Sequence, residues 1–295
     1  MVFAKKTLGQ HFLRSAGALQ KIVGAAQLLP ADTVLEVGPG EGVLTELLLK
    51  QAGKVIAVEK DDRLIPVLEQ KFAAEIASGE FELIHADILE FSIFNFQFSK
   101  KPYKIVANLP YYITGQFLRK FLQGTECPPH TMVLLLQKEV ARRIVASDKK
   151  ESILSISVKA YGTPKYIGTV KAGAFSPPPN VDSAIIAIEH ISKEFFTGTD
   201  SYSSFAKGGG RVGEAGGFKS LPASEGGTPF RKGRMNEQEF FAFLKKGFAH
   251  PRKLLASNVG VTSATLKECN IAEKARPENL SLADWKHLFL FLSYS

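Results

Sequence analysis

Apolar positions between residues 33 and 147 follow two alternating patterns, and this alternation predicts the fold. Short runs rich in Val, Ile and Leu predict buried strands at 33–38, 54–59, 81–86, 103–108 and 131–136. Between them, apolar residues at helical spacing predict helices at 42–51, 61–77, 114–123 and 137–147. Apolar strands that alternate with amphipathic helices are typical of a parallel, doubly wound α/β sheet.

The segments on either side extend this core. Ser15 is the expected N-cap of a helix that runs to about residue 28. The polar segment before it carries apolar Phe12 and Leu13, so we expect it to fold back onto the domain. Two further strands are predicted at 166–170 and 183–191. We therefore assign residues 1–192 to one α/β domain.

The last third of the chain has a different character. Residues 198–233 hold ten glycines and five serines, which is the composition of a flexible linker or surface insertion. We assign 193–234 to such a linker or insertion. Helical periodicity then resumes and predicts helices at 236–249, 251–259, 263–268 and 282–292. Residues 235–295 are therefore expected to form a small all-helical domain.

A glycine-rich turn follows the first strand of the alternating region. Gly38, Gly40 and Gly42 separate that strand from a helix, a geometry that brings backbone N–H groups close to a ligand. Glycine suits this turn because a Cβ atom would block both the unusual backbone angles and the close approach. Glu59 ends the next strand, about 20 residues later, where a carboxylate suits ribose hydroxyls. An ordinary tight turn is the alternative for the loop taken alone.

The acids of this loop indicate which nucleoside to expect. The spacing is Gly-x-Gly-x-Gly, whereas the dinucleotide fingerprint is Gly-x-Gly-x-x-Gly. Carboxylates at Glu36 and Glu41 would repel a diphosphate and attract a cation. S-adenosylmethionine carries a sulfonium and an amino group, so the loop favours it over NAD.

Polar residues or glycines end four consecutive predicted strands. Ligands of doubly wound sheets bind at the carboxyl ends of the strands, near the point where the strand order reverses. Asp87 at such an end suits the exocyclic amine of an adenine, although a helix cap or turn is the alternative for a lone Asp. The four strand-end residues are Gly38, Glu59, Asp87 and Asn108.

The fourth strand ends in the tetrapeptide Asn108-Leu109-Pro110-Tyr111. The Asn108 carboxamide oxygen accepts a hydrogen bond, and Pro110 leaves the Leu109 carbonyl without a helical partner. Two such acceptors can hold an amino group with its lone pair directed at a methyl donor. Tyr111 offers a flat face for stacking a base. An ordinary turn is the alternative.

Charge indicates the partner. The chain of 295 residues has a net charge of +8 and a pI near 9.3, which favours a polyanion, most simply nucleic acid, over a merely basic protein. Candidate phosphate contacts are Lys138 and Arg142 on one helix and Arg252 and Lys253 at the start of another, unless these are solvated faces. Phe175, in a proline-rich loop, is either a second stacking face or a buried side chain.

Other classes of protein are disfavoured. No apolar run approaches the roughly 20 residues of a membrane span, and Met1 to Arg14 is too polar for a signal peptide, so we expect a cytoplasmic protein. Cys127 and Cys269 lack neighbours at ligand spacing, which argues against a disulfide or a zinc site, and the six scattered histidines imply no metal. Nothing demands more than a monomer.

Taken together, the motifs resemble the ribosomal RNA adenine N6-dimethyltransferase family, in particular its branch that acts on small-subunit RNA. The resemblance covers nearly the whole chain outside the linker. Members have a Rossmann-like S-adenosylmethionine-dependent methyltransferase domain followed by a small helical domain. The matching segments are 9–13, 36–40, Glu59, Asp87, 108–111, 175–183, 252–253 and 276–280.

The resemblance implies roles for individual residues. It places the S-adenosylmethionine site at His11, Leu13, Gly38, Glu59, Asp87 and Asn108. It implies that Asn108, Leu109, Pro110 and Tyr111 position the target adenine, with Phe175 helping to hold it. Relatives commonly have Asn in place of His11, and the Gly-rich segment departs from their usual short connection.

The resemblance also implies an activity and a partner. The expected reaction is N6,N6-dimethylation of two adjacent adenosines near the 3′ end of small-subunit (16S) RNA, within the small ribosomal subunit or its precursor, as part of ribosome biogenesis. Two alternatives are the large-subunit adenine methylation that confers macrolide resistance and a non-catalytic role in small-subunit assembly. The basic N-terminal segment and the 175–183 loop favour the small-subunit enzyme.

Overall fold

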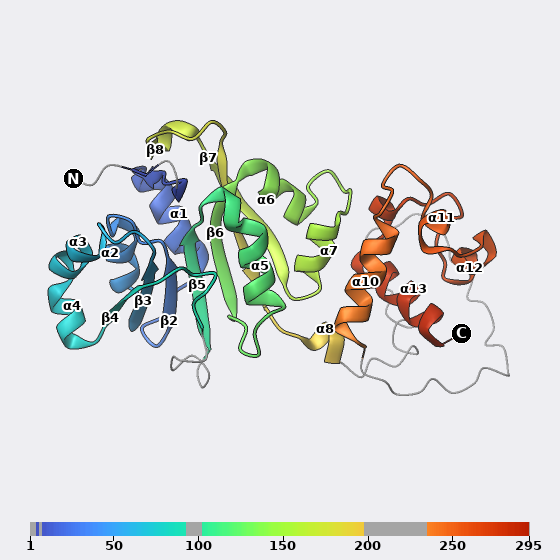
Figure 1. Cartoon of the computed structure of the whole chain (residues 1–295), viewed down its shortest axis with the longest axis horizontal. Helices are drawn as coiled ribbons and strands as arrows, with labels where there is room; N and C mark the ends of the chain where they lie inside the picture. The colour runs from blue at the N-terminus through green and yellow to red at the C-terminus, as the bar shows by residue number, and fades with distance from the viewer. Residues whose placement is uncertain (1–3, 6–7, 93–101, 198–234, 295) are drawn as a thin grey trace, which may run out of the picture. The chain divides into compact units, whose positions relative to one another are not determined.

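The computed structural model describes residues 4–5, 8–92, 102–197 and 235–294, and these divide into two units, 1–192 and 193–295. A seven-stranded sheet forms the first unit, in the order β4-β3-β2-β5-β6-β9-β7 (Figure 1). Its strands are β2 (Thr33–Val37), β3 (Lys54–Glu59), β4 (Phe81–His85), β5 (Tyr103–Asn108), β6 (Thr131–Gln137), β7 (Thr163–Val170) and β9 (Ser183–Glu189).

The first five of these strands are parallel, as the sequence predicts, but the sheet as a whole is mixed. β9 lies antiparallel to both β6 and β7. The parallel arrangement expected between residues 33 and 136 is therefore confirmed, whereas the reversed direction of β9, which alone runs against the other strands of the sheet, lies outside that expectation. The physical reason is that an apolar run records burial on both faces of a strand and carries no information on the direction of that strand.

The strand order places the switch point at the end of β2. The chain builds β3 and β4 on one side of β2 and then returns to add β5 on its other side. Gly38 and Asn108, which follow and end these two neighbouring strands, therefore come together at the edge where ligands of such sheets bind.

Within the described residues of the first unit, seven helices pack around this sheet, and Figure 1 shows helices both in front of it and behind it. Val133 and Leu135 of β6 pack in one core with Ile22 of the first helix, while Met132 and Leu134 are equally buried on the opposite face. The helices are α1 (Ala16–Ala26), α2 (Val43–Leu49), α3 (Ile65–Lys71), α4 (Ala73–Ser78), α5 (Thr114–Leu122), α6 (Lys138–Val145) and α7 (Ile153–Lys159).

The first helix begins as predicted, a second predicted helix is divided in two, and one helix is new. Ser15 caps α1 by accepting a hydrogen bond from the Ala18 N–H, as expected. The single helix predicted at 61–77 is two helices, because Phe72 leaves the helical region with φ −113° and ψ 30°. α7 was not predicted, although the Ser152 side chain caps it by accepting the Ser155 N–H.

A small second sheet ties the N-terminal segment to the proline-rich loop. β1 (Phe12–Leu13) pairs antiparallel with β8 (Phe175–Ser176), so that Leu13 lies opposite Phe175. Leu13 and Phe175 both enter the main core. This pairing confirms that the N-terminal segment folds back onto the domain. Two single-turn 3₁₀ helices lie nearby: η4 (Tyr111–Ile113) follows β5, and η5 (Ala172–Ala174) precedes β8.

The second unit is helical. Trp285 is fully buried and stacks on Phe248, with ring centroids 5.4 Å apart. The first residues of the predicted linker form a helix whose Phe195 and Phe196 rings pack on Phe240, and the rest of that linker lies outside the described residues. The elements are α8 (Glu194–Thr197), α10 (Glu237–Gly247), α11 (Leu255–Val259), α12 (Ser263–Glu268), η6 (Pro277–Asn279) and α13 (Leu282–Tyr294).

The basic pair of this unit lies in a turn, not at a helix start. The predicted helix 251–259 begins only at Leu255, because the Lys253 N–H closes a turn onto the His250 carbonyl and Leu254 is extended. Arg252 and Lys253 are exposed in this turn. Among the described residues, none of the helices is both long and apolar enough to span a membrane.

Candidate functional site

A cavity of about 280 Å³ lies at the carboxyl ends of β2, β3, β4 and β5. Its walls include nearly all the residues that the sequence singles out at strand ends and in the tetrapeptide. Leu13 is the exception, because it is buried and lines a smaller neighbouring cavity with Gly38 and Asn108. The predicted residues that line the main cavity are His11, Gly38, Glu59, Asp87, Asn108, Leu109, Pro110, Tyr111 and Phe175.

The glycine turn has the backbone that the sequence predicts. Gly38 and Gly40 have φ values of +66° and +59°, which L side chains rarely adopt. A Cβ atom on Gly40 would lie 3.1 Å from the Phe12 ring, so the turn also needs the space. The Gly40 N–H donates to Oε2 of Glu59 at 3.2 Å, which joins the turn to the next strand.

Glu59 is a buried carboxylate held by the backbone. Its Oε1 accepts the N–H groups of Lys60 (2.9 Å) and Asp61 (2.8 Å), and its Oε2 accepts that of Gly40. Burial raises the pKa of Glu59, while these three hydrogen bonds lower it and limit the rise. A carboxylate has about four acceptor positions, so about one remains for a ligand on the cavity side.

Asp87 follows β4 and is fixed from two sides. Its Oδ1 accepts the Leu89 N–H at 2.9 Å, and its Oδ2 accepts Lys60 Nζ at 2.6 Å. Partial burial pushes the pKa of Asp87 upward. The hydrogen bonds from Lys60 and Leu89, and the positive charges of Lys60 and Lys120, outweigh this, so the pKa of Asp87 lies below its usual value. Asp87 is therefore an ionised acceptor at the cavity wall.

Asn108 and Leu109 present acceptors at the end of β5. The Asn108 amide nitrogen donates to the His11 backbone carbonyl at 3.0 Å, which leaves the carboxamide oxygen for another donor. The Ile113 N–H donates to the Pro110 carbonyl, so the turn after β5 starts one residue beyond the Leu109 carbonyl. Both acceptors of the tetrapeptide therefore lie at the end of β5, and their role toward an amine stays a prediction.

The aromatic residues of the site are partly committed to other contacts. The Tyr111 hydroxyl lies 2.7 Å from Ser183 Oγ, and its ring stacks on His11 with centroids 6.0 Å apart. His11 Nδ1 is 2.8 Å from the Pro177 carbonyl, so His11 joins the N-terminal segment to the proline-rich loop. Phe175 is only 5% exposed and packs in the core while it also borders the cavity.

The acids of the glycine loop do not act as the sequence suggests. Glu36 is 1% exposed and accepts a hydrogen bond from Thr45 Oγ1 at 2.7 Å on the helix-covered face of β2. Burial raises the pKa of Glu36 to about 8, so this carboxyl is largely protonated at neutral pH. Glu41 pairs with Arg14 at 2.5 Å. The prediction that both attract a cationic ligand is therefore wrong, and Glu59 and Asp87 are the acids that line the cavity.

The buried Glu36 makes stability depend on pH. Between its ordinary pKa of 4.5 and about 8, the folded state keeps a proton that the unfolded chain has released. Stability is therefore lost as pH rises through this window, by up to about 1.4 kcal/mol per unit. We expect Glu36→Gln to remove this pH-dependent loss. In urea unfolding between pH 5 and pH 8, the free energy of unfolding of the variant should therefore increase with pH relative to that of wild type. Parallel pH curves for the two proteins would contradict this.

The basic residues predicted to contact nucleic acid do not line the cavity. Lys138 Nζ lies 3.6 Å from Asp182, and Arg142 is exposed in the last turn of α6. Arg252 and Lys253 belong to the second unit. These four residues lie at the protein surface, and their contact with nucleic acid stays a prediction.

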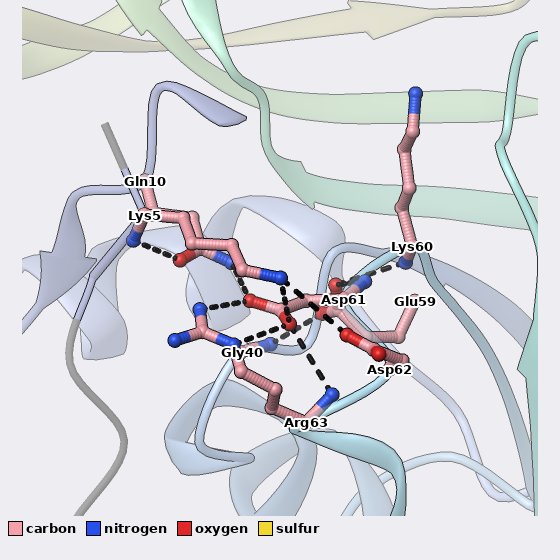
Figure 2. Close-up of polar contacts among 8 residues, drawn as sticks. All are labelled: Lys5, Gln10, Gly40, Glu59, Lys60, Asp61, Asp62 and Arg63. Carbon is pink, nitrogen blue, oxygen red and sulfur yellow. Dashed lines mark hydrogen bonds and ion pairs between the residues drawn. The ribbon is translucent and has the colours of Figure 1, made fainter. Parts of the chain in front are cut away.

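Sequence reasoning missed three polar residues beside the cavity. Gln10 and Lys60 line it, and Asp61 lies directly behind Glu59 (Figure 2). The sequence signal was the run of alternating charge Glu59-Lys60-Asp61 at the end of a strand. Nothing in the sequence shows that Gln10, 51 residues away from Asp61, is its hydrogen-bond partner.

Comparison with known proteins gives a consistent picture. The sequence model of the ribosomal RNA adenine dimethylase family matches residues 2–207. A protein named ribosomal RNA small subunit methyltransferase A from Dehalococcoides mccartyi is 41% identical, over 97% of this chain and 88% of its own. The protein of that name from Rippkaea orientalis is 34% identical, over 95% and 94%.

A solved structure agrees with the sequence relatives. The crystal structure of a dimethyladenosine transferase from Plasmodium falciparum matches with a TM-score of 0.70 and 26% identity, over 94% of this chain and 96% of that one. The similarity therefore extends through the residues that build the cavity and into the C-terminal part of the chain.

Proposed function

The chain belongs to the ribosomal RNA adenine dimethylase family, and from that premise we propose that it dimethylates N6 of two adjacent adenosines in small-subunit ribosomal RNA with S-adenosylmethionine. The observation that carries the proposal is the meeting of Glu59, Asp87 and Asn108 at one cavity. These are the acceptors that a nucleoside cofactor and an adenine amine require.

The residues present fit S-adenosylmethionine. Glu59 keeps about one acceptor position that suits a ribose hydroxyl, because backbone donors use the others. Asp87 is ionised and suits the exocyclic amine of the adenine ring. Val58 and Ile88 give the same cavity apolar walls for that ring. When bound, the cofactor supplies an electrophilic methyl group.

The tetrapeptide positions the target base. The Asn108 carboxamide oxygen and the Leu109 carbonyl accept the two N6 protons, which directs the nitrogen lone pair toward the methyl donor. Alignment contributes several kcal/mol. A strong general base is not required, because N6 is cationic and acidic after it gains the methyl group, and its proton then passes to solvent water. The target adenine must leave its stack to reach the cavity. Tyr111 and Phe175, which both line the cavity, replace part of the lost stacking.

The partner and the setting follow from the relatives and the charge. Small-subunit RNA is the substrate in the names of the bacterial relatives, and a net charge of +8 suits an RNA partner. Lys138, Arg142, Arg252 and Lys253 are our candidates for phosphate contacts. We extend the proposal to a monomeric protein that acts in the cytoplasm during ribosome biogenesis.

Methyl transfer to isolated ribosomal subunits tests this function. Unmethylated small subunits and large subunits are incubated separately with labelled S-adenosylmethionine, and their RNA is digested to nucleosides. We expect label in N6,N6-dimethyladenosine from the small subunit. Label from the large subunit alone would overturn the substrate in favour of the macrolide-resistance activity. Tight binding to small subunits without label would overturn catalysis and leave an assembly role.

A further inference from the structure

Asp61 is a buried carboxylate just outside the cavity, and polar groups of Lys5, Gln10 and Arg63 converge on it (Figure 2). Arg63 donates from Nε to Oδ1 at 2.9 Å and from Nη2 to Oδ2 at 2.6 Å. Gln10 Nε2 donates to Oδ2 at 2.8 Å, and Lys5 Nζ lies 3.6 Å from Oδ1. These contacts hold the pKa of Asp61 well below its usual value, chiefly through Arg63.

The contacts of Asp61 join two walls of the cavity. Its backbone N–H donates to Glu59, the acceptor proposed for the ribose. Its side chain holds Gln10, which lines the cavity together with Leu8, Gly9 and His11 of the N-terminal segment. The Lys60 side chain points away from this network (Figure 2). Its Nζ donates to Asp87 Oδ2 at 2.6 Å. Asp61 itself does not contribute to the cavity lining described above.

The N-terminal segment forms a closed turn on Asp61. Gln10 Oε1 accepts the Lys5 N–H at 2.8 Å, and the Leu8 N–H donates to the Lys5 carbonyl at 3.1 Å. Both polar atoms of the Gln10 amide are therefore used: Oε1 accepts the Lys5 N–H, and Nε2 donates to Asp61. Arg63 neutralises the buried charge, so the acceptor for Gln10 is kept ionised and fixed in direction.

We propose that Asp61 is a positioning residue that fixes the N-terminal segment as a wall of the cofactor cavity, through its hydrogen bond to Gln10. S-adenosylmethionine affinity then depends on a side chain that does not touch the cofactor. The inference rests on the proposed function for the identity of the ligand. The anchoring of the segment is a property of the unliganded protein and can be tested without it.

Two measurements on the full chain test this role. Calorimetric titration with S-adenosylhomocysteine, the stable product form of the cofactor, gives Kd for wild type, Asp61→Asn and Gln10→Ala. We expect about a tenfold rise in Kd for Asp61→Asn and a smaller rise for Gln10→Ala. Trypsin cleavage after Arg14, followed without ligand, should be faster in both variants because their N-terminal segments are released.

Asp62→Asn is the matched control. Asp62 is the adjacent acid and also pairs with Lys5, at 3.5 Å, but its side chain is 71% exposed. Its Kd and cleavage rate should stay within about twofold of wild type. The double variant Asp61→Asn with Gln10→Ala should bind no more weakly than Asp61→Asn alone, because both changes act on the same contact.

The outcomes separate this inference from the proposed function. Additive losses in the double variant, or unchanged cleavage in Asp61→Asn and Gln10→Ala, would overturn the anchoring role. If Asp61→Asn does not fold, Gln10→Ala still decides the question, because it removes the same hydrogen bond from the exposed side. A wild-type protein that fails to bind S-adenosylhomocysteine would overturn the proposed function, while the cleavage rates would still report on the anchor.

Discussion

Replacing Asn108 with Ala should lower kcat for RNA methylation by at least about a hundredfold, because it removes an acceptor aimed at the reacting amine. The cofactor Kd should change by less than about threefold, since Glu59 and Asp87 keep their positions through separate backbone contacts. Single-turnover transfer to small subunits at saturating cofactor measures the first effect, and calorimetric titration measures the second.

The Asn108→Asp variant tests the oxygen and the nitrogen of the side-chain amide separately. Aspartate keeps an oxygen acceptor for the adenine amine but loses the donor that bonds the His11 carbonyl at 3.0 Å. We expect it to retain more turnover than Asn108→Ala. We expect its cofactor binding to be weaker than that of Asn108→Ala, because the second carboxylate oxygen of Asp faces the His11 carbonyl, an acceptor against an acceptor. Turnover of Asn108→Ala within about tenfold of wild type would contradict the assignment of Asn108 to the target amine.

The position of the cavity could be predicted from the sequence because it follows from strand ends. The carboxyl ends of neighbouring parallel strands lie at one edge of a sheet, so Gly38, Glu59, Asp87 and Asn108 needed only correct strand boundaries to be brought together. The direction of β9 could not be predicted in the same way. Its residues are buried on both faces, and such a run fits either direction.

Glu36 shows a clue that the sequence contained and that the loop interpretation overlooked. Alternate residues of a strand point to opposite faces, and Val34, two residues earlier, packs against the helices of the main core. Glu36 therefore points to the same helix-covered face, where it meets Thr45 of α2 and not the ligand edge. The alternation of side chains along a strand predicts that Glu36 faces these helices, whereas treating Glu36 only as a charge near the glycines does not.

The partners of Asp61 show what local pattern cannot supply. Gln10 reaches Asp61 only because β1 pairs with β8 and brings the N-terminal segment across the ends of the main strands. That pairing consists of two residues on each side, which is too short for an alternating pattern to appear in the sequence. The wall formed by the N-terminal segment therefore depends on tertiary contacts, whereas the strand ends can be predicted from the local sequence.

The acid that binds the cofactor should be Glu59, and its replacement should have the largest effect on affinity. In Glu59→Gln, the amide oxygen can keep the N–H groups of Lys60 and Asp61, which places the amide nitrogen against the Gly40 N–H. A donor then faces a donor, and the cavity loses its ribose acceptor. We expect Kd for S-adenosylhomocysteine to rise about a hundredfold.

Glu41→Gln is the comparison that makes this result decisive. Glu41 belongs to the same glycine loop but pairs with Arg14, so its loss should change Kd by no more than about twofold. With saturating cofactor, Glu59→Gln should keep kcat within about threefold, because the groups that hold the target amine are intact. A loss of affinity in Glu41→Gln as large as that in Glu59→Gln would mean that the charge of the loop, and not the strand-end carboxylate, selects the cofactor.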